Sequence, residues 1–440
     1  MLLLLACTAK DADSALLVDT APQPVDWSMQ AVRLADTVSP PGDGLQWSRS
    51  IVHLHSPWSH DACDGEGYVD GVFDTSCLDD MRRGLCEAAI DTAWLTDHPA
   101  YAALPDWDEL ISAQDGDELV EQDGRTVGVR FTCDDGSTTL LRPGYEDMLM
   151  PVGLEVHVAD DAETRDDLLN RADQEAVDAM VAAGGLVLQA HTEERDRETL
   201  YERQAVGLSG VEVFNLHAMV DPTNREQYLG LDPIGWVSDA APFLDPETIA
   251  EPDLVFLPIV QDQQVSLDHF DALAATRHTV AVAGTDAHRN SLPSLMADGE
   301  RIDSYRRMMR WFSNWVVTPG DAPDQLDAAL AAGHSYVVFD VFGAPDGLGF
   351  EATDEGVLAS CVSLARQSPQ GSDAPEIGYE ILKDGVLWAS GCGEAHATDG
   401  PGVYRLRVTI VPHHLGDFLP DEQGDWMRAF TWALSNPVVL

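Results

Sequence analysis

Residues 52–65 read VHLHSPWSHDACDG, and this stretch is the most informative part of the chain. His53 and His55 are two residues apart, so in an extended strand both imidazoles point to the same face. A loop that carries His60 and Asp61 follows directly. Imidazoles and a carboxylate at the exit of a strand are typical of one half of a metal site.

A second cluster of the same kind lies far along the chain. The segment VAVAGTDAHRN places Asp286 and His288 two residues apart, after an apolar strand-like run at Thr279–Ala283. Two strand-end clusters of imidazole and carboxylate ligands indicate a metal site that is assembled from distant parts of the chain.

Strand-like runs that end in polar residues alternate with helix-like stretches from about residue 48 to residue 340. The expected strands are Ile51–His55, Ile90–Thr96, Val152–Val158, Gly185–His191, Val211–Asn215 and Thr279–Thr285. The expected helices are Asp70–Ala89, Arg165–Ala183, Leu267–Thr276 and Asp321–Gly333. This alternation predicts an α/β fold with a parallel sheet, open or closed into a barrel. In such folds ligands bind at the carboxyl ends of the strands.

The pattern changes after residue 340. Short strand-like runs between Gly, Asp and Pro turns follow, at Ile377–Leu382, Val386–Ala389, Val403–Val411 and Phe430–Leu434. The KDG turn at residues 383–385 is typical of a β-hairpin. We therefore expect a metal-binding α/β unit over residues 47–340 and a small all-β domain over residues 341–440.

The composition is strongly acidic. The 440 residues include 76 acidic and 25 basic side chains, which gives a net charge of −51. Such a field repels phosphate backbones and argues against nucleic acid as a partner. It attracts divalent cations, although a solvated acidic surface suited to a salty habitat is the stronger interpretation. No run reaches the ~18 apolar residues of a membrane helix.

The N-terminus, MLLLLAC, resembles a bacterial lipobox, in which Cys7 is lipidated after signal cleavage. The apolar run is short and lacks a basic start, so either the true start lies upstream or the match is accidental. We expect residues 1–7 to be a truncated lipoprotein signal, because residues 8–46 read as a flexible acidic linker rich in Asp, Thr, Ala and Pro. The protein would then be exported and lipid-anchored at Cys7 in a bacterial cell envelope.

Six further cysteines can pair if the protein is exported. They are Cys63, Cys77, Cys86, Cys133, Cys361 and Cys392. Cys361 with Cys392 is the expected pair, because both lie in the C-terminal segment. Six buried thiols in a reducing compartment are the alternative if Cys7 is not an anchor.

Eight residues at the expected strand ends are the candidate metal ligands. They are His53, His55, His60, His98, Glu155, His191, Asp286 and His288. Imidazole with carboxylate suits Zn²⁺, Mn²⁺ or Fe²⁺, and the absence of thiolates among them argues against a purely structural zinc. So many ligands fit two or three ions, with Glu155 as a bridge. We expect the remaining histidines to be incidental: His217, His269, His278, His334, His396, His413 and His414.

Closely spaced ions would share a water, lower its pKa toward ~7, and hold both the attacking and the leaving oxygen. This predicts hydrolysis by a metal-bound hydroxide, with Glu155 and Asp286 beside the reacting water and no side-chain nucleophile. Asp97 is a candidate for orienting the ring of His98. A helix cap is the alternative role for Asp97.

The segments HLHSPWSH, TDH, GLE, the His of LQAH, and GTDAH resemble the successive motifs of the polymerase-and-histidinol-phosphatase (PHP) domain, over about residues 50–340. The resemblance implies a distorted seven-stranded (β/α) barrel with a multinuclear centre. It also implies three ligand sets: His53, His55, Glu155 and Asp286 for one ion, Glu155 and His191 for a second, and His60, His98 and His288 for a third.

Other segments resemble the CehA/McbA-type metallohydrolases, whose namesakes cleave carbamate esters. These are SHDACDG, the run GVEVFN with Glu212 and Asn215, and the ending WALSNPVVL. A C-terminal β extension is similar to theirs. Many relatives place a further His between the bridging Glu and the next metal ligand, and here His157 is the candidate.

The sequence thus predicts a hydrolase that cleaves an ester, carbamate or phosphoester of a small molecule. Arg289, Arg195 and Arg197 follow ligands and could contact phosphate, or pair with neighbouring carboxylates. Trp58 and Tyr68 could line an aryl pocket, or simply pack. The alternative from another class is a non-catalytic envelope protein that keeps the metal-binding barrel as a binding or scaffolding module. The presence of all eight ligands argues against it. The sequence does not indicate an oligomeric state.

Overall fold

The computed structural model describes residues 32–245, 250–365, 373–420 and 426–440. The expected signal at residues 1–7, with Cys7, lies outside the described residues, as does the linker as far as residue 31. Residues 32–45 pack against the body of the protein. Leu34 and Val38 are buried, and the Arg33 guanidinium donates to the carbonyl of Ile90 at 2.7 Å. This part of the expected linker therefore belongs to the folded unit.

The largest element is a mixed sheet of 12 strands. Its strands, in spatial order, are β19 (Val386–Ser390), β18 (Glu376–Lys383), β21 (Val403–Val411), β22 (Phe430–Ser435), β13 (Ser335–Val338), β12 (Ser313–Thr318), β1 (Gln46–Ile51), β4 (Thr92–Trp94), β7 (Thr138–Arg142), β6 (Arg125–Thr132) and β5 (Glu118–Gln122), with β23 (Val438–Val439) beside β21. The strands β1, β4 and β7 are parallel, and the other pairings are antiparallel.

A second sheet contains β11 (Val280–Gly284), β10 (Gly210–Asn215), β9 (Leu186–Gln189) and β8 (Met150–Val152). Here β9, β10 and β11 are parallel, whereas β8 runs antiparallel to β9. Isolated bridges join Leu54 to Ala287 and Gly144 to Val152. The chain after β1 therefore meets the chain after β11, and the chain after β7 meets β8. The fold is mixed α/β, as expected, and its ladders form two sheets linked by these bridges.

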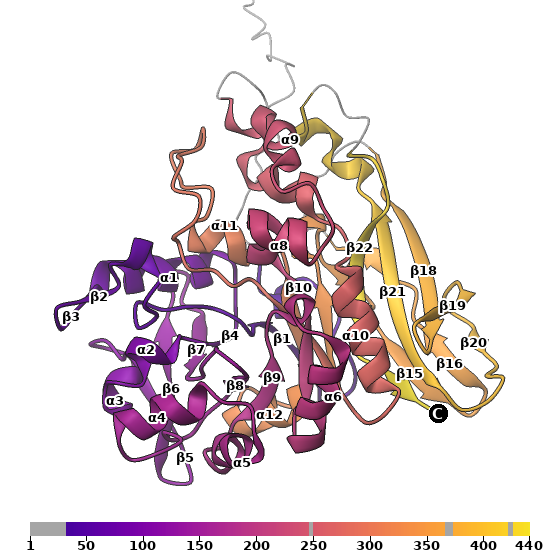
Figure 1. The fold of residues 1–440 in the computed structure, drawn as a ribbon. Coiled ribbons are helices and arrows are strands. Elements are labelled where there is room, and N and C mark those ends of the chain that lie inside the picture. Colours follow the sequence, from indigo (N-terminus) through magenta and orange to yellow (C-terminus); the bar gives the residue numbers. More distant parts are fainter. Residues whose placement is uncertain (1–31, 246–249, 366–372, 421–425) are drawn as a thin grey trace, which may run out of the picture.

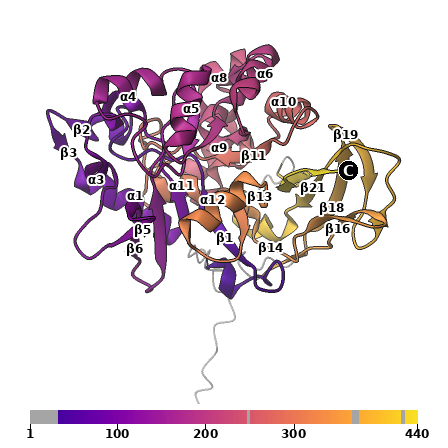
Figure 2. The same cartoon turned by 90° about the horizontal axis from the view of Figure 1, so that it is seen from below.

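Helices cover the outer sides of the sheets (Figures 1 and 2). They are α1 (Thr75–Glu87), α2 (Pro99–Ala102), α3 (Trp107–Leu110), α4 (Ala162–Leu169), α5 (Gln174–Ala182), α6 (Arg197–Val206), α7 (Leu216–Val220), α8 (Pro222–Gln227), α9 (Gly235–Leu244), α10 (Gln264–Ala274), α11 (Tyr305–Met309) and α12 (Pro323–Ala331). Helix α5 packs on β9, α10 on β10 and α12 on β12. The expected helix over residues 165–183 is two helices, because Asp173 caps the start of α5 through the backbone N–H of Ala176. None of the described helices is long and apolar enough to cross a membrane.

Short elements complete the chain. The 3-10 helices are η1 (Leu34–Asp36), η2 (Cys63–Gly65), η3 (Thr192–Glu194), η4 (Pro252–Ile259), η5 (Asp340–Phe342) and η6 (His413–Phe418). The short strands are β2 (Tyr68–Val69), β3 (Val72–Phe73), β14 (Pro345–Asp346), β15 (Phe350–Thr353), β16 (Gly356–Ala359), β17 (Ser363–Leu364) and β20 (Ala395–His396). Strands β15, β16 and β20 form a small sheet of their own.

The C-terminal strands continue the main sheet. Tyr336, in β13, pairs with Ser435, in β22. Beyond residue 340 the described segments contain strands and 3-10 helices. In the described residues the hydrogen-bonded ladder runs on from β13 to β22 and β21, so the domain boundary at residue 341 stays a prediction. Figure 1 shows these strands together along one side of the molecule.

An inner cluster of buried apolar side chains lies between the two sheets and contains Val52, Trp94, Leu140, Leu188 and Val282. Because these residues come from the middle or the end of parallel strands, or from the position just after one, the packing holds those strands together near their carboxyl ends. The polar residues that follow the same strands are thereby brought together.

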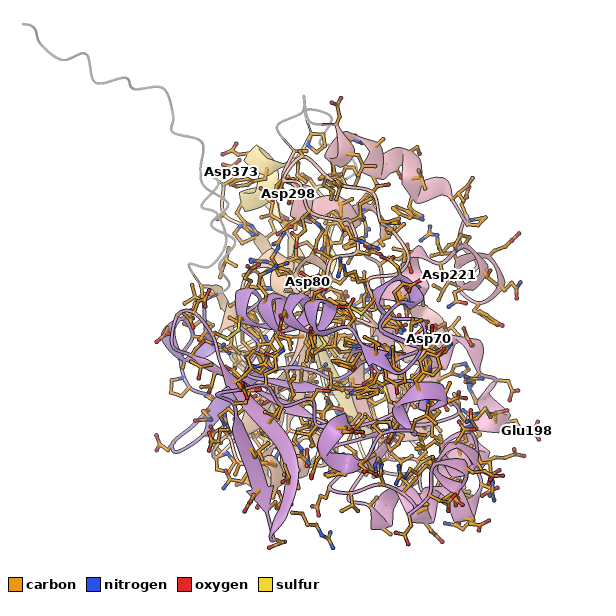
Figure 3. All side chains as sticks on the ribbon, turned by 90° about the vertical axis from the view of Figure 1, so that its left-hand side faces the viewer. Asp70, Asp80, Glu198, Asp221, Asp298 and Asp373 are labelled. Carbon is orange, nitrogen blue, oxygen red and sulfur yellow. A yellow bond between two sulfur atoms is a disulfide. The ribbon has the colours of Figure 1, made fainter. Side chains whose placement is uncertain are left out.

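Three disulfides join Cys63 to Cys77, Cys86 to Cys133 and Cys361 to Cys392. The expected pair of Cys361 with Cys392 is confirmed. The acidic side chains are spread over the surface. Figure 3 labels six of them, and Asp70, Glu198, Asp298 and Asp373 are exposed.

Candidate metal centre

Polar residues gather where the parallel strands end. His53 and His55 follow β1, His98 follows β4, and His191 follows β9. Asp286 and His288 follow β11. These six residues, all expected as ligands, lie in one cluster with three more: Asp61, Glu146 and His217. His53 and His55 lie just beyond β1, which ends at Ile51, rather than within the strand as expected.

Asp286 is the centre of the cluster. Its Oδ1 lies 3.2 Å from Nε2 of both His53 and His55. Its Oδ2 lies 3.3 Å from His191 Nε2 and 3.4 Å from His217 Nδ1. The side chain is almost completely buried. One carboxylate therefore faces these four imidazoles, which come from three other segments of the chain.

A second group lies around Asp61. Its Oδ2 is 3.2 Å from His288 Nε2 and 3.6 Å from His98 Nε2. Donor atoms of His55, Asp61, His98 and His288 all lie within 4.8 Å of one another. The ring of His55 stacks on that of His288, with 3.7 Å between the centroids. The two groups are therefore contiguous.

Glu146 supplies a third carboxylate and follows β7. Its Oε2 lies 3.1 Å from His98 Nδ1, and its Oε1 lies 3.9 Å from His191 Nε2. A donor atom of Glu146 also lies within 4.8 Å of donor atoms of His53 and His55. Glu146 is 4% exposed. It stands between the two groups, as a bridging carboxylate would.

The expectation that Glu155 bridges the ions is wrong. Glu155 accepts a hydrogen bond from Gln122 Nε2 at 2.7 Å and pairs with Arg125 at 3.4 Å. The physical reason is the direction of β8, which is antiparallel to β9. Its carboxyl end lies at the opposite edge of the sheet, and Gly153, at φ +74°, turns the chain away. Glu146, between β7 and β8, lies on the correct side.

Three other expectations need qualification. His157 lies away from the cluster, because its Nδ1 is 3.3 Å from Tyr145 Oη and its Nε2 is 3.2 Å from the carbonyl of Pro105. Asp97 accepts hydrogen bonds from the backbone N–H and hydroxyl of Ser56, so it holds the loop after His55. His60 is exposed at the rim, with its ring 5.0 Å from that of His98.

Asp61, Glu146 and His217 lie outside the eight expected ligands, and His217, expected to be incidental, belongs to the cluster. Asp61 is adjacent to His60, and the loop turns Asp61 inward. Glu146 follows a strand of the meander β5–β6–β7, which the sequence pattern did not separate. His217 follows Asn215 at the end of β10, so its place after a parallel strand is the signal that could have identified it.

Backbone conformation also shapes the centre. His191 and Asp286 both have positive φ, +47° and +52°. Left-handed backbone is unfavourable for residues with a Cβ and concentrates at functional sites. The Asp286 backbone N–H and the Thr285 hydroxyl both donate to the carbonyl of His53, at 3.1 and 2.8 Å. These bonds hold the turn after β11 against the chain after β1.

Burial and neighbouring charges set the ionisation of the cluster. Burial lowers the pKa of His55, and the charge of His288 lowers it further. Burial also lowers the pKa of His98, but its hydrogen bond to Asp61 and the charge of Glu146 outweigh that effect and raise it to about 9. Burial opposes ionisation of Asp286, yet His53 and His288 hold its pKa well below the usual range. Burial raises the pKa of Asp97 to about 6.

The donor set fits divalent cations. Within the described residues, Asp286 Oδ1 and His288 Nε2 are buried and form no hydrogen bond of good geometry, although each has a polar atom 3.2 Å away. The Nε2 atoms of His53 and His55 face each other at 3.1 Å. Buried polar atoms are costly without a partner, and a cation among these lone pairs would supply one. Imidazole and carboxylate donors suit Zn²⁺, Mn²⁺ or Fe²⁺.

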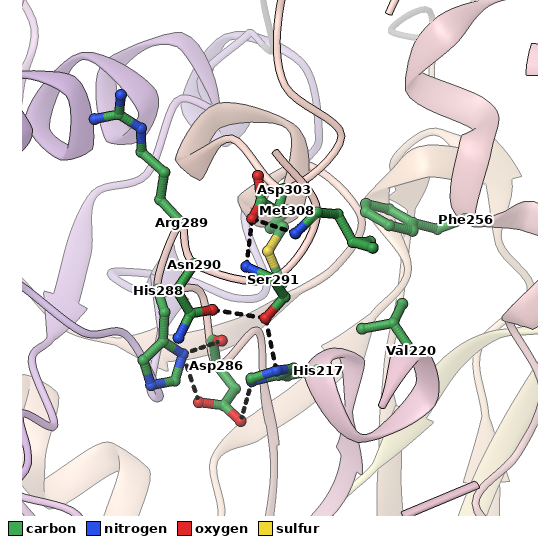
Figure 4. Close-up of a pocket in the computed structure, with 11 residues that line it drawn as sticks. His217, Val220, Phe256, Asp286, His288, Arg289, Asn290, Ser291, Asp303 and Met308 are labelled. Atoms are coloured by element: carbon green, nitrogen blue, oxygen red, sulfur yellow. Dashed lines mark hydrogen bonds and ion pairs between the residues drawn. The ribbon is translucent and has the colours of Figure 1, made fainter. Parts of the chain in front are cut away.

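A small pocket opens beside the centre (Figure 4). Asp286, His288 and His217 line one side of it, and Val220 and Phe256 belong to an apolar wall. On the same face, His217 Nε2 lies 3.0 Å from the hydroxyl of Ser291. A small group placed here would touch both the candidate ligands and an apolar surface.

Two further sequence candidates have structural roles. Trp58 is 7% exposed, donates its indole N–H to Ser112 Oγ at 3.0 Å, and packs on Tyr68 and Phe73. The side chain of Arg289 points away from the pocket in Figure 4 and pairs with Asp80 at 3.5 Å. Trp58 therefore packs, and Arg289 does not face the cluster.

No family model and no curated protein matches this chain. One similar solved structure is that of a two-domain protein from Bacteroides vulgatus that contains a predicted PHP-like metal-dependent phosphoesterase. The match covers 93% of this chain and 99% of that chain, with 12% identity and a TM-score of 0.36. Similarity this weak supports no conclusion about chemistry, which rests here on the cluster itself.

Proposed function

We propose that this protein is a metal-dependent hydrolase of the PHP type. The observation that carries the proposal is Asp286, whose two buried oxygens lie within 3.4 Å of ring nitrogens from five histidines. A distorted barrel in the order β1, β4, β7, β8, β9, β10 and β11 would explain why these residues converge. The bridges from Leu54 to Ala287 and from Gly144 to Val152 support that order.

The donors divide into sets for two or three divalent ions. The first set is His53, His55, Glu146 and Asp286; the second is His191, Glu146 and Asp286; and the third is Asp61, His98 and His288. Glu146 takes the bridging place that Glu155 cannot occupy. Asp61 adds a carboxylate to the set expected around His60, His98 and His288.

Divalent ions held here would polarise a scissile carbonyl or phosphoryl group and acidify a bound water. The chain contributes the rest of the site. The apolar wall with Val220 and Phe256 shields one side of a bound substrate from water. His217 and Ser291 form a polar rim on the same pocket, at hydrogen-bond distance from each other. Ser56 and Asp97 hold the loop that carries His55.

Among small esters, an uncharged carboxylic ester or carbamate is expected to be a better substrate than a phosphate monoester. Arg289 faces Asp80 rather than the pocket. Arg197 donates to the carbonyl of Asp268. The net charge of −51 also repels dianions. A phosphodiester, with one negative charge, would lie between the two classes.

Export and a lipid anchor at Cys7 are part of the proposal. Three disulfides support an oxidising compartment, where such bonds persist. Mass spectrometry of the protein from bacterial membranes should find acyl chains on the peptide that contains Cys7. Recovery of an unmodified Cys7 peptide would contradict the anchor.

The test combines metal analysis with p-nitrophenyl carboxylic, carbamate and phosphate esters. We expect two or three metal equivalents, loss of activity in chelator, and recovery on adding Zn²⁺ or Mn²⁺. His53→Ala should be inactive, whereas His157→Ala, a histidine outside the centre, should remain active. Less than one equivalent of metal with chelator-insensitive activity would refute the proposal. Full metal loading without turnover of any ester would favour the binding or scaffolding alternative.

A further inference from the structure

Glu212 lies behind the candidate metal centre and contacts two of its segments. It is on β10, and its side chain is completely buried. Glu212 Oε1 lies 2.8 Å from His53 Nδ1. Glu212 Oε2 accepts from the backbone N–H of His191 and from Asn215 Nδ2, each at 3.0 Å. The carboxylate thus touches the far side of one metal ligand and the backbone of another.

Gly284 gives Glu212 its path to His53. A Cβ added at Gly284 would lie 1.7 Å from Glu212 Oε1 and 2.8 Å from His53 Cβ. Gly284 does not have positive φ, so the space, and not the backbone conformation, requires glycine. Gly284 lies on β11, two residues before Asp286. The strand therefore leaves room for a carboxylate that reaches across from its neighbour β10.

The hydrogen bond to His191 has a second consequence. His191 is in the left-handed region, at φ +47° and ψ +52°, which is unfavourable for a residue with a Cβ. Glu212 Oε2 accepts the N–H of this residue and so stabilises the turn. The turn directs His191 Nε2 toward Asp286 Oδ2, 3.3 Å away.

We propose that Glu212 is a positioning residue of the metal centre. It holds His53 with the proton on Nδ1, so that the lone pair of Nε2 faces Asp286, and it fixes the turn that presents His191. Gly284 keeps the route to His53 open. This inference rests on the metal centre proposed above. Hydrogen-bond partners behind a ligand of this kind fix its tautomer and raise its basicity.

The substitution Glu212→Gln tests the tautomer directly. Both partners of Glu212 Oε2 are N–H donors. In the variant, the amide oxygen of glutamine must therefore occupy the position of Oε2. Asn215 cannot reverse its own amide, because its Oδ1 accepts from the N–H of Ala218 at 2.9 Å. The new NH₂ group then faces His53 Nδ1 and requires a lone pair there. His53 would carry its proton on Nε2, where the cation should bind.

The experiment measures Zn²⁺ affinity and the ¹⁵N shifts of histidine-labelled, Zn²⁺-loaded protein. Wild type should show His53 protonated at Nδ1 and bound through Nε2. In Glu212→Gln the affinity of the first ion should fall at least about tenfold, and the Nδ1–H signal of His53 should disappear. Gly284→Ala should also lower the affinity, although every ligand is intact.

Asp340→Asn is the matched control. Asp340 accepts from Trp315 Nε1 at 3.0 Å and pairs with Arg49 at 3.4 Å, so it is a largely buried carboxylate without a place in the centre. Its variant should keep wild-type Zn²⁺ affinity even if it unfolds at a lower temperature. Wild-type affinity and an unchanged His53 signal in Glu212→Gln would overturn the Glu212 proposal alone. Wild-type protein that binds no Zn²⁺ would overturn the metal centre itself.

Discussion

The substitutions Glu146→Gln and Glu155→Gln test which of the two glutamates binds metal. The structure favours Glu146, whereas the strand pattern alone favours Glu155. Glu146→Gln changes a buried carboxylate that lies 3.1 Å from His98 Nδ1 and 3.9 Å from His191 Nε2. Glu155→Gln changes a carboxylate that contacts Gln122 and Arg125 instead. We expect the first variant to lose metal and the second to keep it.

The magnitude follows from the position of each charge. A unit charge acting over about 4 Å in a protein contributes about 4 kcal/mol at an effective dielectric constant of about 20, before desolvation offsets part of it. Loss of a partner behind a ligand lowers metal affinity about 10–100-fold. Removal of a ligand itself should therefore cost at least about 100-fold, or about 2.7 kcal/mol. Glu155 is 23% exposed and belongs to a pair worth at most about 1 kcal/mol of stability.

The assay is competition with a fluorescent Zn²⁺ chelator, together with a thermal melt of each variant. Glu155→Gln should keep its affinity within about twofold. A loss of affinity in Glu155→Gln with Glu146→Gln unchanged would place the bridging carboxylate after β8. That result would refute the argument from the direction of β8.

Three other outcomes are expected. Chelation should lower Tm by several degrees, and Zn²⁺ should restore it. The reason is that a ligand at about 100 times its Kd stabilises the native state by about 2.7 kcal/mol. An unchanged Tm would contradict a structural contribution of the ions. Burial lowers the pKa of His414 from 6.5 to about 4, so the unfolded chain takes up a proton first as pH falls. Stability should therefore decrease between pH 6.5 and 4, by up to roughly 3 kcal/mol, and urea titrations should find a smaller decrease in His414→Gln. Arg289→Ala should leave kcat/KM for an uncharged ester within about twofold of wild type, because Arg289 faces Asp80; a large loss of kcat/KM would place its guanidinium on the substrate.

Much of the candidate centre could be predicted because its candidate ligands follow apolar runs that are parallel strands. His53, His98, His191 and Asp286 each come just after such a run. The run at residues 152–158 looked the same, but the strand is only Met150–Val152 and is antiparallel. Strand direction depends on which strands pair, and hydrophobic pattern does not contain that information. Glu155 was therefore placed at the wrong edge.

The missed ligands have a related cause. His60 and Asp61 are consecutive in one loop, and only the path of the loop determines which side chain turns inward. Ser59 Oγ donates to Asp61 Oδ1 at 2.7 Å and lies 3.1 Å from His55 Nδ1, which fixes Asp61 beside the histidines. Such a contact between loop residues is set by tertiary packing. The residue types alone favoured His60, because imidazole is the commoner ligand.

The charges behind and within the cluster bear on the number of ions. Within the described residues, five carboxylates lie within 4.0 Å of a ring nitrogen of the cluster: Asp61, Glu146, Glu193, Glu212 and Asp286. Four of them are at most 4% exposed. Buried charges of one sign are stable only when they are compensated. Two divalent ions would leave one negative charge and three would leave one positive charge, whereas a single ion would leave three carboxylates uncompensated. A carboxylate that only orients a ligand, such as Glu212, adds as much negative charge to the centre as a ligand carboxylate does. Removing the charge of Glu212 should therefore reduce the number of ions that the centre binds as well as its affinity for them.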